Sequence, residues 1–73
     1  MKIDYWTELN NEELEIIDDM EIISENSSLH VLEIVKIHGG ATYRSLYEIS
    51  TGNLIEHGKF LETVDLLKPL TTN

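Results

Sequence analysis

The chain has 73 residues, a formal net charge of −9 and no cysteine. A chain of this length forms one domain with a thin hydrophobic core, and without cysteine it has neither disulfides nor a thiolate for catalysis or metal binding. The charge disfavours direct binding to nucleic acid and to anionic membranes, which carry charge of the same sign. No apolar run approaches the roughly 18 residues of a membrane span, and the first six residues lack the features of a secretory signal. We therefore expect one cytoplasmic domain over residues 1–73.

The acidic residues are unevenly distributed along the chain. Residues 1–35 contain ten acids and a single base, Lys2, whereas residues 36–73 contain four acids and four bases. The whole net charge thus belongs to the first half of the chain. Such asymmetry bears on solubility and on charged partners rather than on the fold.

An acidic helix is predicted over residues 7–20. Asn10 is a favourable N-cap residue, and Glu13 three positions later completes a capping-box pattern. Apolar residues recur at helical spacing on one face, namely Trp6, Leu9, Ile16, Ile17, Met20 and Ile23. The alternative that this region leaves open is a strand whose inner face carries Leu14, Ile16, Met20 and Ile22. Residues 21–24 are expected to be extended already.

Two strands joined by a tight turn are predicted to follow. Residues 29–37 and 41–49 are rich in β-branched and aromatic residues, and residues 38–40 supply a glycine-containing loop of three residues. In the resulting register Val35 lies opposite Tyr43, and Leu46 lies across from Leu32. Tyr43 and Tyr47 then point toward the core, and Arg44 points away from it.

A third strand is predicted over residues 54–59 and a second helix over residues 60–68, because Phe60, Val64 and Leu67 recur at i, i+4 and i+7. Pro69 ends this helix, and residues 69–73 are expected to form a loose tail. The predicted fold class is α+β. It comprises a small three-stranded antiparallel sheet, an N-terminal acidic helix and a short C-terminal helix, in the order α-β-β-β-α.

The leading candidate site is the acidic face of the first helix. Four carboxylates recur there at i, i+4, i+7 and i+11, and a fifth lies beside them: Glu8, Glu12, Glu15, Asp19 and Asp18. Neighbouring carboxylates on one helix face lie ~5–6 Å apart, a spacing that suits the basic groove of a nucleic-acid-binding protein. A solvated face that only confers solubility is the alternative, although such faces usually mix both signs of charge.

Apolar residues on both faces of the sheet provide a second candidate surface. Leu32 and Ile34 lie on the face opposite Val31 and Val35, and the predicted register adds Leu46 to the first pair. Two helices of the same chain cover these faces in one interpretation, and a second copy of the chain covers them in the other. Self-association through Leu32, Ile34 and Leu46 is therefore the alternative to a monomer.

No pattern in the chain indicates catalysis, a cofactor or a metal site. His30, His38 and His57 lack the short spacing of zinc ligands and are expected at the surface or in turns. There is no calcium-binding loop, phosphate-binding glycine loop or nucleophile elbow. A thin core also leaves little room for a pocket of ~300 Å³ or more. We therefore predict that the protein is not an enzyme.

These features favour a small intracellular regulator or inhibitor that docks its acidic helix on a basic protein partner, for example a nucleic-acid-binding protein. The profile resembles that of the small inhibitors that phages carry against host nucleic-acid enzymes, and this resemblance is one of length and charge with no motif behind it. The alternative function is that of a homodimeric structural or assembly module without catalytic activity, whose acidity serves solubility.

Overall fold

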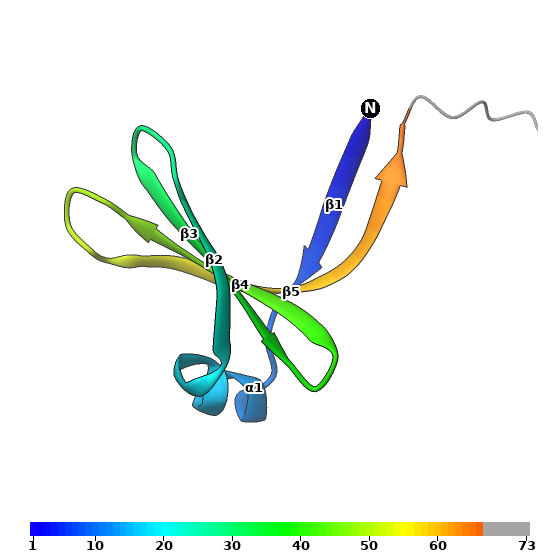
Figure 1. Cartoon of the computed structure of the whole chain (residues 1–73), viewed down its shortest axis with the longest axis horizontal. Coiled ribbons are helices and arrows are strands. Elements are labelled where there is room, and N and C mark those ends of the chain that lie inside the picture. Colours follow the sequence, from blue (N-terminus) through cyan, green and yellow to red (C-terminus); the bar gives the residue numbers. More distant parts are fainter. Residues whose placement is uncertain (67–73) are drawn as a thin grey trace, which may run out of the picture.

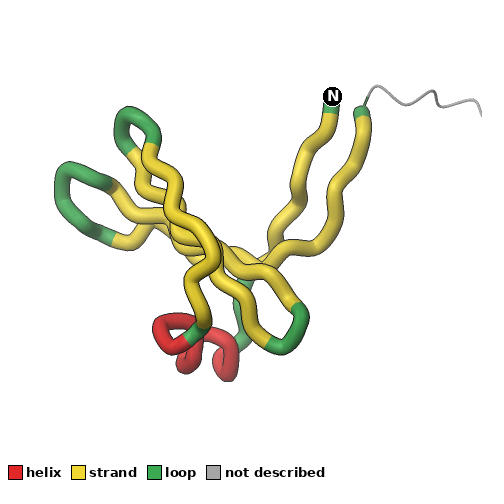
Figure 2. Tube along the Cα trace, in the orientation of Figure 1, coloured by secondary structure: helices red, strands yellow, loops and turns green. Residues whose placement is uncertain are grey.

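The computed structural model describes residues 1–66, which form one antiparallel sheet of five strands and a short helical segment (Figure 1). Within residues 1–66, helices contribute only the segment between the first two strands, at one end of the described structure (Figure 2). The elements in chain order are β1 (Lys2–Thr7), α1 (Asn11–Ile16), the 3₁₀ helix η1 (Ile17–Asp19), β2 (Glu21–Ser27), β3 (Val31–His38), β4 (Ala41–Glu48) and β5 (Leu54–Asp65). No helix in this part of the chain has the length and apolar character needed to cross a membrane.

The strand order in the sheet is β1-β5-β4-β3-β2. The long strand β5 changes its neighbours along its length: Leu54–Lys59 pairs with β4, and Lys59–Asp65 pairs with β1. The second half of β5 and β1 therefore leave the rest of the sheet as a two-stranded ribbon (Figure 1). The predicted fold class, with three strands and two terminal helices, is wrong.

The first predicted helix is correct in its N-terminal cap and wrong in its extent. The capping box is confirmed, because the Glu13 backbone N–H donates to Asn10 Oδ1 at 2.8 Å and the Asn10 backbone N–H donates to Glu13 Oε1 at 2.9 Å. The α-helix nevertheless ends at Ile16, and one 3₁₀ turn leads directly into β2. The expectation of an extended chain at residues 21–24 is confirmed, because β2 runs over Glu21–Ser27.

Residues 60–65 form the second half of β5 rather than the predicted C-terminal helix. Phe60, Leu61, Thr63 and Val64 are residue types that suit strands, and β1 offers them a pairing partner that the sequence reading did not foresee. Tertiary pairing thus overrides the helical spacing of the apolar residues. The predicted positions of Leu67, of Pro69 and of the tail at residues 69–73 lie outside the described residues.

The β3–β4 hairpin closes with two residues instead of three. Gly39 and Gly40 have positive φ angles of 58° and 80°, as the favoured two-residue hairpin turn requires, and His38 pairs with Ala41. The register is therefore shifted by one residue from the prediction, so that Tyr43 lies opposite Lys36. A shift of one residue reverses the face on which a partner's side chain lies.

The core is as thin as the length predicts. Among the described residues, the buried apolar side chains are Ile17, Met20 and Tyr43, which pack with the partly buried Leu9, Ile16 and Ala41. Many large apolar residues elsewhere in the sheet remain exposed, including Ile22, Ile23, Ile49, Leu54 and Ile55. The small core lies where α1 and η1 meet the β3–β4 hairpin.

Two sets of polar contacts hold the helical segment on the sheet. Lys36 of β3 is only 4% exposed, and its Nζ donates to the Ile17 carbonyl oxygen at 3.0 Å. On the helix, Glu13 Oε2 accepts from the Tyr43 hydroxyl at 3.0 Å and pairs with Lys59 Nζ at 3.1 Å. These contacts fix which side of the helical segment faces the sheet.

We expect Lys36→Met to lower the free energy of unfolding by about 1–3 kcal/mol, because it removes the buried hydrogen bond from Lys36 Nζ. The Ile17 carbonyl oxygen then keeps only the longer bond from the Met20 backbone N–H, at 3.3 Å. Urea unfolding followed by circular dichroism measures the change. Lys2→Met makes the same change in net charge at an exposed position and serves as the control. Equal stability of the two variants would contradict this role of Lys36.

Candidate functional site

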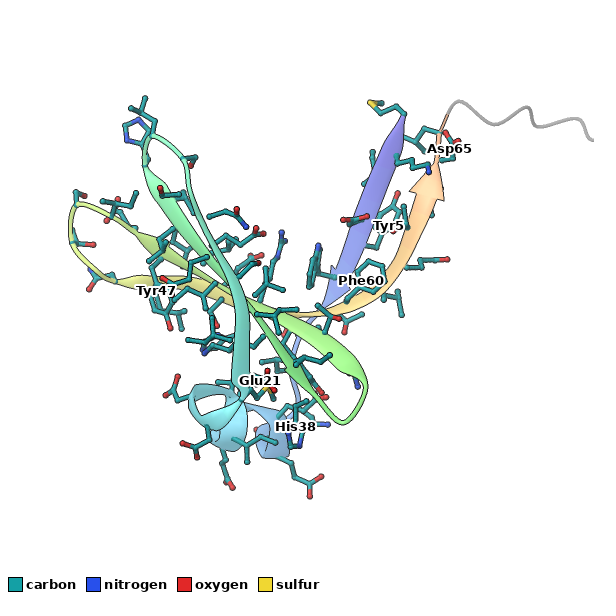
Figure 3. The ribbon with its side chains drawn as sticks, viewed as in Figure 1. Tyr5, Glu21, His38, Tyr47, Phe60 and Asp65 are labelled. Atoms are coloured by element: carbon teal, nitrogen blue, oxygen red, sulfur yellow. The ribbon has the colours of Figure 1, made fainter. Side chains whose placement is uncertain are left out.

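Five exposed carboxylates of the first half gather where α1 and η1 join β2. Glu12, Glu15, Asp18, Asp19 and Glu21 are all exposed, while Ile17 and Met20 between them are buried. Glu21 marks this end of the molecule in Figure 3. Residues three apart are neighbours on an α-helix, and the 3₁₀ helix has about three residues per turn. The helical segment therefore presents Glu12, Glu15 and Asp18 on its outer side. We call Glu12, Glu15, Asp18, Asp19 and Glu21 the acidic end.

Glu8 does not belong to the acidic end. It precedes the N-cap Asn10 and lines a hollow beside Trp6. The predicted stripe of Glu8, Glu12, Glu15 and Asp19 along one continuous helix is therefore wrong, because the α-helix covers only Asn11–Ile16. The other four predicted residues, including Asp18, share one end of the molecule.

The basic residues of the sheet are paired mostly with other acids. Arg44 lies between Glu33 and Glu56, at 3.6 and 3.5 Å. Lys59 pairs with Glu13, and the buried Lys36 lies 3.9 Å from the exposed carboxylate of Asp18. Within residues 1–66, no ion pair involves Glu12, Glu15, Asp19 or Glu21. Ion pairs within the described residues therefore leave nearly all of the negative charge of the acidic end unneutralised.

Glu13 differs from its acidic neighbours because it is part of the fold. The Asn10 backbone N–H lowers the pKa of Glu13 most, and the contacts with Lys59 and Tyr43 lower it further. Burial and the hydrogen bond to Glu13 raise the pKa of Tyr43. Both shifts keep a hydroxyl donor facing a carboxylate acceptor across the helix–sheet contact.

An apolar hollow of about 360 Å³ lies on the sheet face that α1 covers only in part. Its apolar lining residues are Leu32, Ile34, Tyr47 and Ile49, and Tyr47 is labelled in Figure 3. Leu46 instead lies opposite Glu33 on the other face. The predicted set of self-association residues is thus divided: Leu32 and Ile34 share a surface, and the one-residue register shift removes Leu46 from it.

A second hollow, of about 380 Å³, lies beside β5. It is lined by Trp6, Thr7, Glu8, Leu9 and Leu14 from the first half of the chain and by Glu56, His57 and Gly58 from β5. Both hollows exceed the volume that the thin core was expected to allow, because neither lies inside a core. The first lies over β3, β4 and the following turn, and the second lies between β1, α1 and β5. We call this second hollow the Trp6 hollow.

Trp6 is fixed by contacts that the sequence did not indicate. The Arg44 guanidinium carbon lies 4.4 Å from the centroid of its ring, and the Phe60 ring meets it edge-on at 5.5 Å. Gly58 permits this close approach, since an added Cβ would lie 3.2 Å from Trp6 Cβ. The contacts depend on β1, which was not predicted, so sequence reasoning had no signal for them.

His57 is partly buried, contrary to the expected surface position of all three histidines. Its Nδ1 lies 2.9 Å from Ser45 Oγ on β4. Burial lowers the pKa of His57, the nearby Lys36 ammonium lowers it further, and Asp18 partly opposes these effects. Ser45 has no exposed surface, so a substrate cannot reach its hydroxyl and the pair serves the packing of β4 on β5.

The described residues contain no group of three or more histidine, aspartate or glutamate side chains arranged to hold a metal ion. No protein-family model, curated protein or solved structure matches the chain. Its function is therefore argued from the geometry of the acidic end and of the two hollows.

We expect stability to decrease as the pH falls below about 6.5, the ordinary pKa of histidine. The folded pKa of His57 is lowered, so in this range the unfolded chain takes up a proton that the folded protein resists. His57→Gln should show a smaller loss of stability between pH 7 and pH 5 than the wild type, as measured by urea unfolding. His30→Gln, at an exposed position, is the control, and a pH dependence unchanged by His57→Gln would contradict the assignment.

Proposed function

We propose that the protein is a small binding regulator or inhibitor that docks its acidic end on the basic surface of another protein. The observation that carries the proposal is the set of exposed carboxylates with no basic counterpart among the described residues, apart from the 3.9 Å contact of Asp18 with Lys36. Like charges at neighbouring helix positions are destabilising. An unneutralised group of this kind is stabilised when a basic partner supplies the missing charge.

The construction of the acidic end supports this proposal. Glu13 and Lys36 hold the helical segment on the sheet, so the outer carboxylates have a fixed arrangement before any partner arrives. A fixed negative surface speeds encounter with a basic protein and favours it over acidic competitors. A nucleic-acid-binding protein fits this description, because its binding surface is basic and is shaped for closely spaced anionic groups.

The combined variant Glu12→Gln, Glu15→Gln, Asp18→Asn and Asp19→Asn should lose its partner in affinity capture from the native cell. Four exposed ion pairs of ordinary strength account for about a 30-fold loss of affinity. Capture by the wild type should also fall steeply between low and high salt, because salt screens such pairs.

A matched comparison separates position from net charge. Glu12→Gln with Glu15→Gln and Glu25→Gln with Glu62→Gln remove the same charge at exposed positions, and only the first pair belongs to the acidic end. If both double variants lost the partner to the same extent, net charge and not the position of the carboxylates would explain the effect. Full retention of the partner by the fourfold variant would refute the proposal.

A homodimeric assembly module is the second candidate function. The specific observation in its favour is the apolar hollow around Leu32, Ile34, Tyr47 and Ile49 in a protein whose described part buries so few apolar side chains. Exposed apolar patches of this kind often mark an interface. Such a dimer would join two strongly negative copies, so it would become tighter, not weaker, as salt screens their repulsion.

Leu32→Glu should abolish any concentration-dependent increase in mass, measured by analytical ultracentrifugation. It places a charge inside the apolar hollow, where an apposed copy would have to desolvate it. Leu46→Glu introduces the same group on the opposite face of the sheet and should leave the mass unchanged. A monomer at all concentrations, or an equal effect of both substitutions, would count against this second candidate.

A further inference from the structure

The edge of β5 is open over its first half. Leu54–Lys59 pairs with β4 on one side, whereas β1 joins the other side only from Lys59 onward. On the side away from β4, residues 54–58 therefore have no strand partner within the described part of the chain. Unpaired backbone N–H and C=O groups along a strand edge are a template for an added strand.

The Trp6 hollow lies along this open edge. Glu56, His57 and Gly58 belong to the unpaired stretch of β5, and Leu9, Leu14 and Trp6 provide apolar surface from the first half of the chain. Glu8 adds a carboxylate that has no ion pair among residues 1–66. The hollow thus combines apolar and aromatic surface with negative charge.

We propose that an extended segment of a basic partner adds as a strand to residues 54–58 of β5 and places one lysine or arginine side chain in the Trp6 hollow. The aliphatic stem of that side chain lies on Leu9 and Leu14, and its cationic head meets the Glu8 carboxylate. This inference rests on the proposed function, because it specifies the shape and one residue type of the basic partner.

The other strand edges fit this role less well. The exposed edge strand β2 carries Glu21 and Glu25 and contains a register irregularity between Ile22 and Ser24, which hinders regular pairing. Among the described residues, the hollow beside β2 is smaller, at about 280 Å³, and its carboxylate, Glu33, is already paired with Arg44. The larger hollow, of about 380 Å³, lies beside the unpaired stretch of β5 and includes Glu8, which has no ion pair among residues 1–66.

A second copy of the chain is a poorer occupant than a basic peptide. Among the described side chains, Lys36, Arg44 and Lys59 are already paired within the fold. Lys2 remains, and it lies on a strand that is itself paired with β5. A copy of this protein therefore brings little positive charge to the hollow, whereas a basic protein brings it readily.

The test uses a capped seven-residue peptide of alternating threonine and valine with a central arginine. Two matched peptides serve as controls. In one, neutral citrulline replaces the arginine. In the other, the backbone nitrogens along one edge of the peptide are methylated. Titration of the ¹⁵N-labelled protein should shift the Trp6 indole and the amides of His57 and Gly58. We expect the citrulline and N-methylated peptides to bind about tenfold more weakly, the effect of losing one charge-assisted contact or a set of strand hydrogen bonds.

Protein variants separate this inference from the proposed function. Glu8→Gln should weaken the arginine peptide about three- to tenfold, and Glu25→Gln, at an exposed position of β2, should not. Loss of peptide binding in Glu12→Gln with Glu15→Gln but not in Glu8→Gln would overturn the inference and leave the acidic end as the site. Equal binding of all three peptides, no shift near Trp6, or the same shifts on raising the protein concentration without peptide would also overturn it. Retention of the cellular partner by the fourfold acidic variant would refute the proposed function while leaving the peptide result intact.

Discussion

The contact between the buried Lys36 ammonium and the Ile17 carbonyl is the constraint on which the arrangement of this protein depends. Only three apolar side chains are buried in the described part of the chain, and at roughly 1.5–3 kcal/mol each they cannot alone hold a helical segment in place against its conformational entropy. A buried ammonium without a partner is strongly unfavourable, so the position of the Ile17 carbonyl is tightly specified. Together with the contacts of Glu13, this tie turns Ile17 and Met20 inward and leaves Glu12, Glu15 and Asp18 facing solvent. The orientation of the acidic end is thus a consequence of how the sheet satisfies one buried charge.

The same logic divides the carboxylates of the chain into two groups. Glu13, Glu33 and Glu56 neutralise the bases of the sheet and are part of its construction. The carboxylates of the acidic end, apart from the long contact of Asp18, have no such role among the described residues. The bases of the second half are therefore not available to balance the acids of the first half. The electrostatic asymmetry of the folded protein follows that of the sequence, but its cause is the pairing within the sheet rather than the separation of the two halves in space.

Local patterns in the sequence predicted local features, and long-range pairing accounts for the failures. The capping box of Asn10 and Glu13 and the opposite orientations of Tyr43 and Arg44 follow from neighbouring residues and are confirmed. The helical spacing of Phe60, Val64 and Leu67 carried no information about β1, which lies almost a full chain length away and converts residues 60–65 into a strand. The register of the β3–β4 hairpin depends on whether two or three residues form the turn, and the conformations of Gly39 and Gly40 decide this. Because the turn is one residue shorter than predicted, Leu46 was assigned to the wrong face of the sheet, and Lys36 was not expected to lie opposite Tyr43. The Trp6 hollow could not be predicted because its lining residues come from β1, the segment before α1, α1 itself and β5, which only long-range pairing brings together.

The exchange of partners along β5 links the fold to the surfaces that are open for binding. A strand that pairs with β4 in its first half and with β1 in its second half must leave part of each side unpaired unless another element covers it. In this chain, the segment that leaves β1 departs toward α1 instead of covering residues 54–58, because the capping box and Lys36 fix the helical segment on the β3–β4 side. The open edge and the hollow beside it are therefore produced by the same contacts that orient the acidic end. A substitution that released the helical segment would alter both surfaces together, whereas changes at Glu8 or at Glu12 and Glu15 leave those contacts in place and address each surface separately.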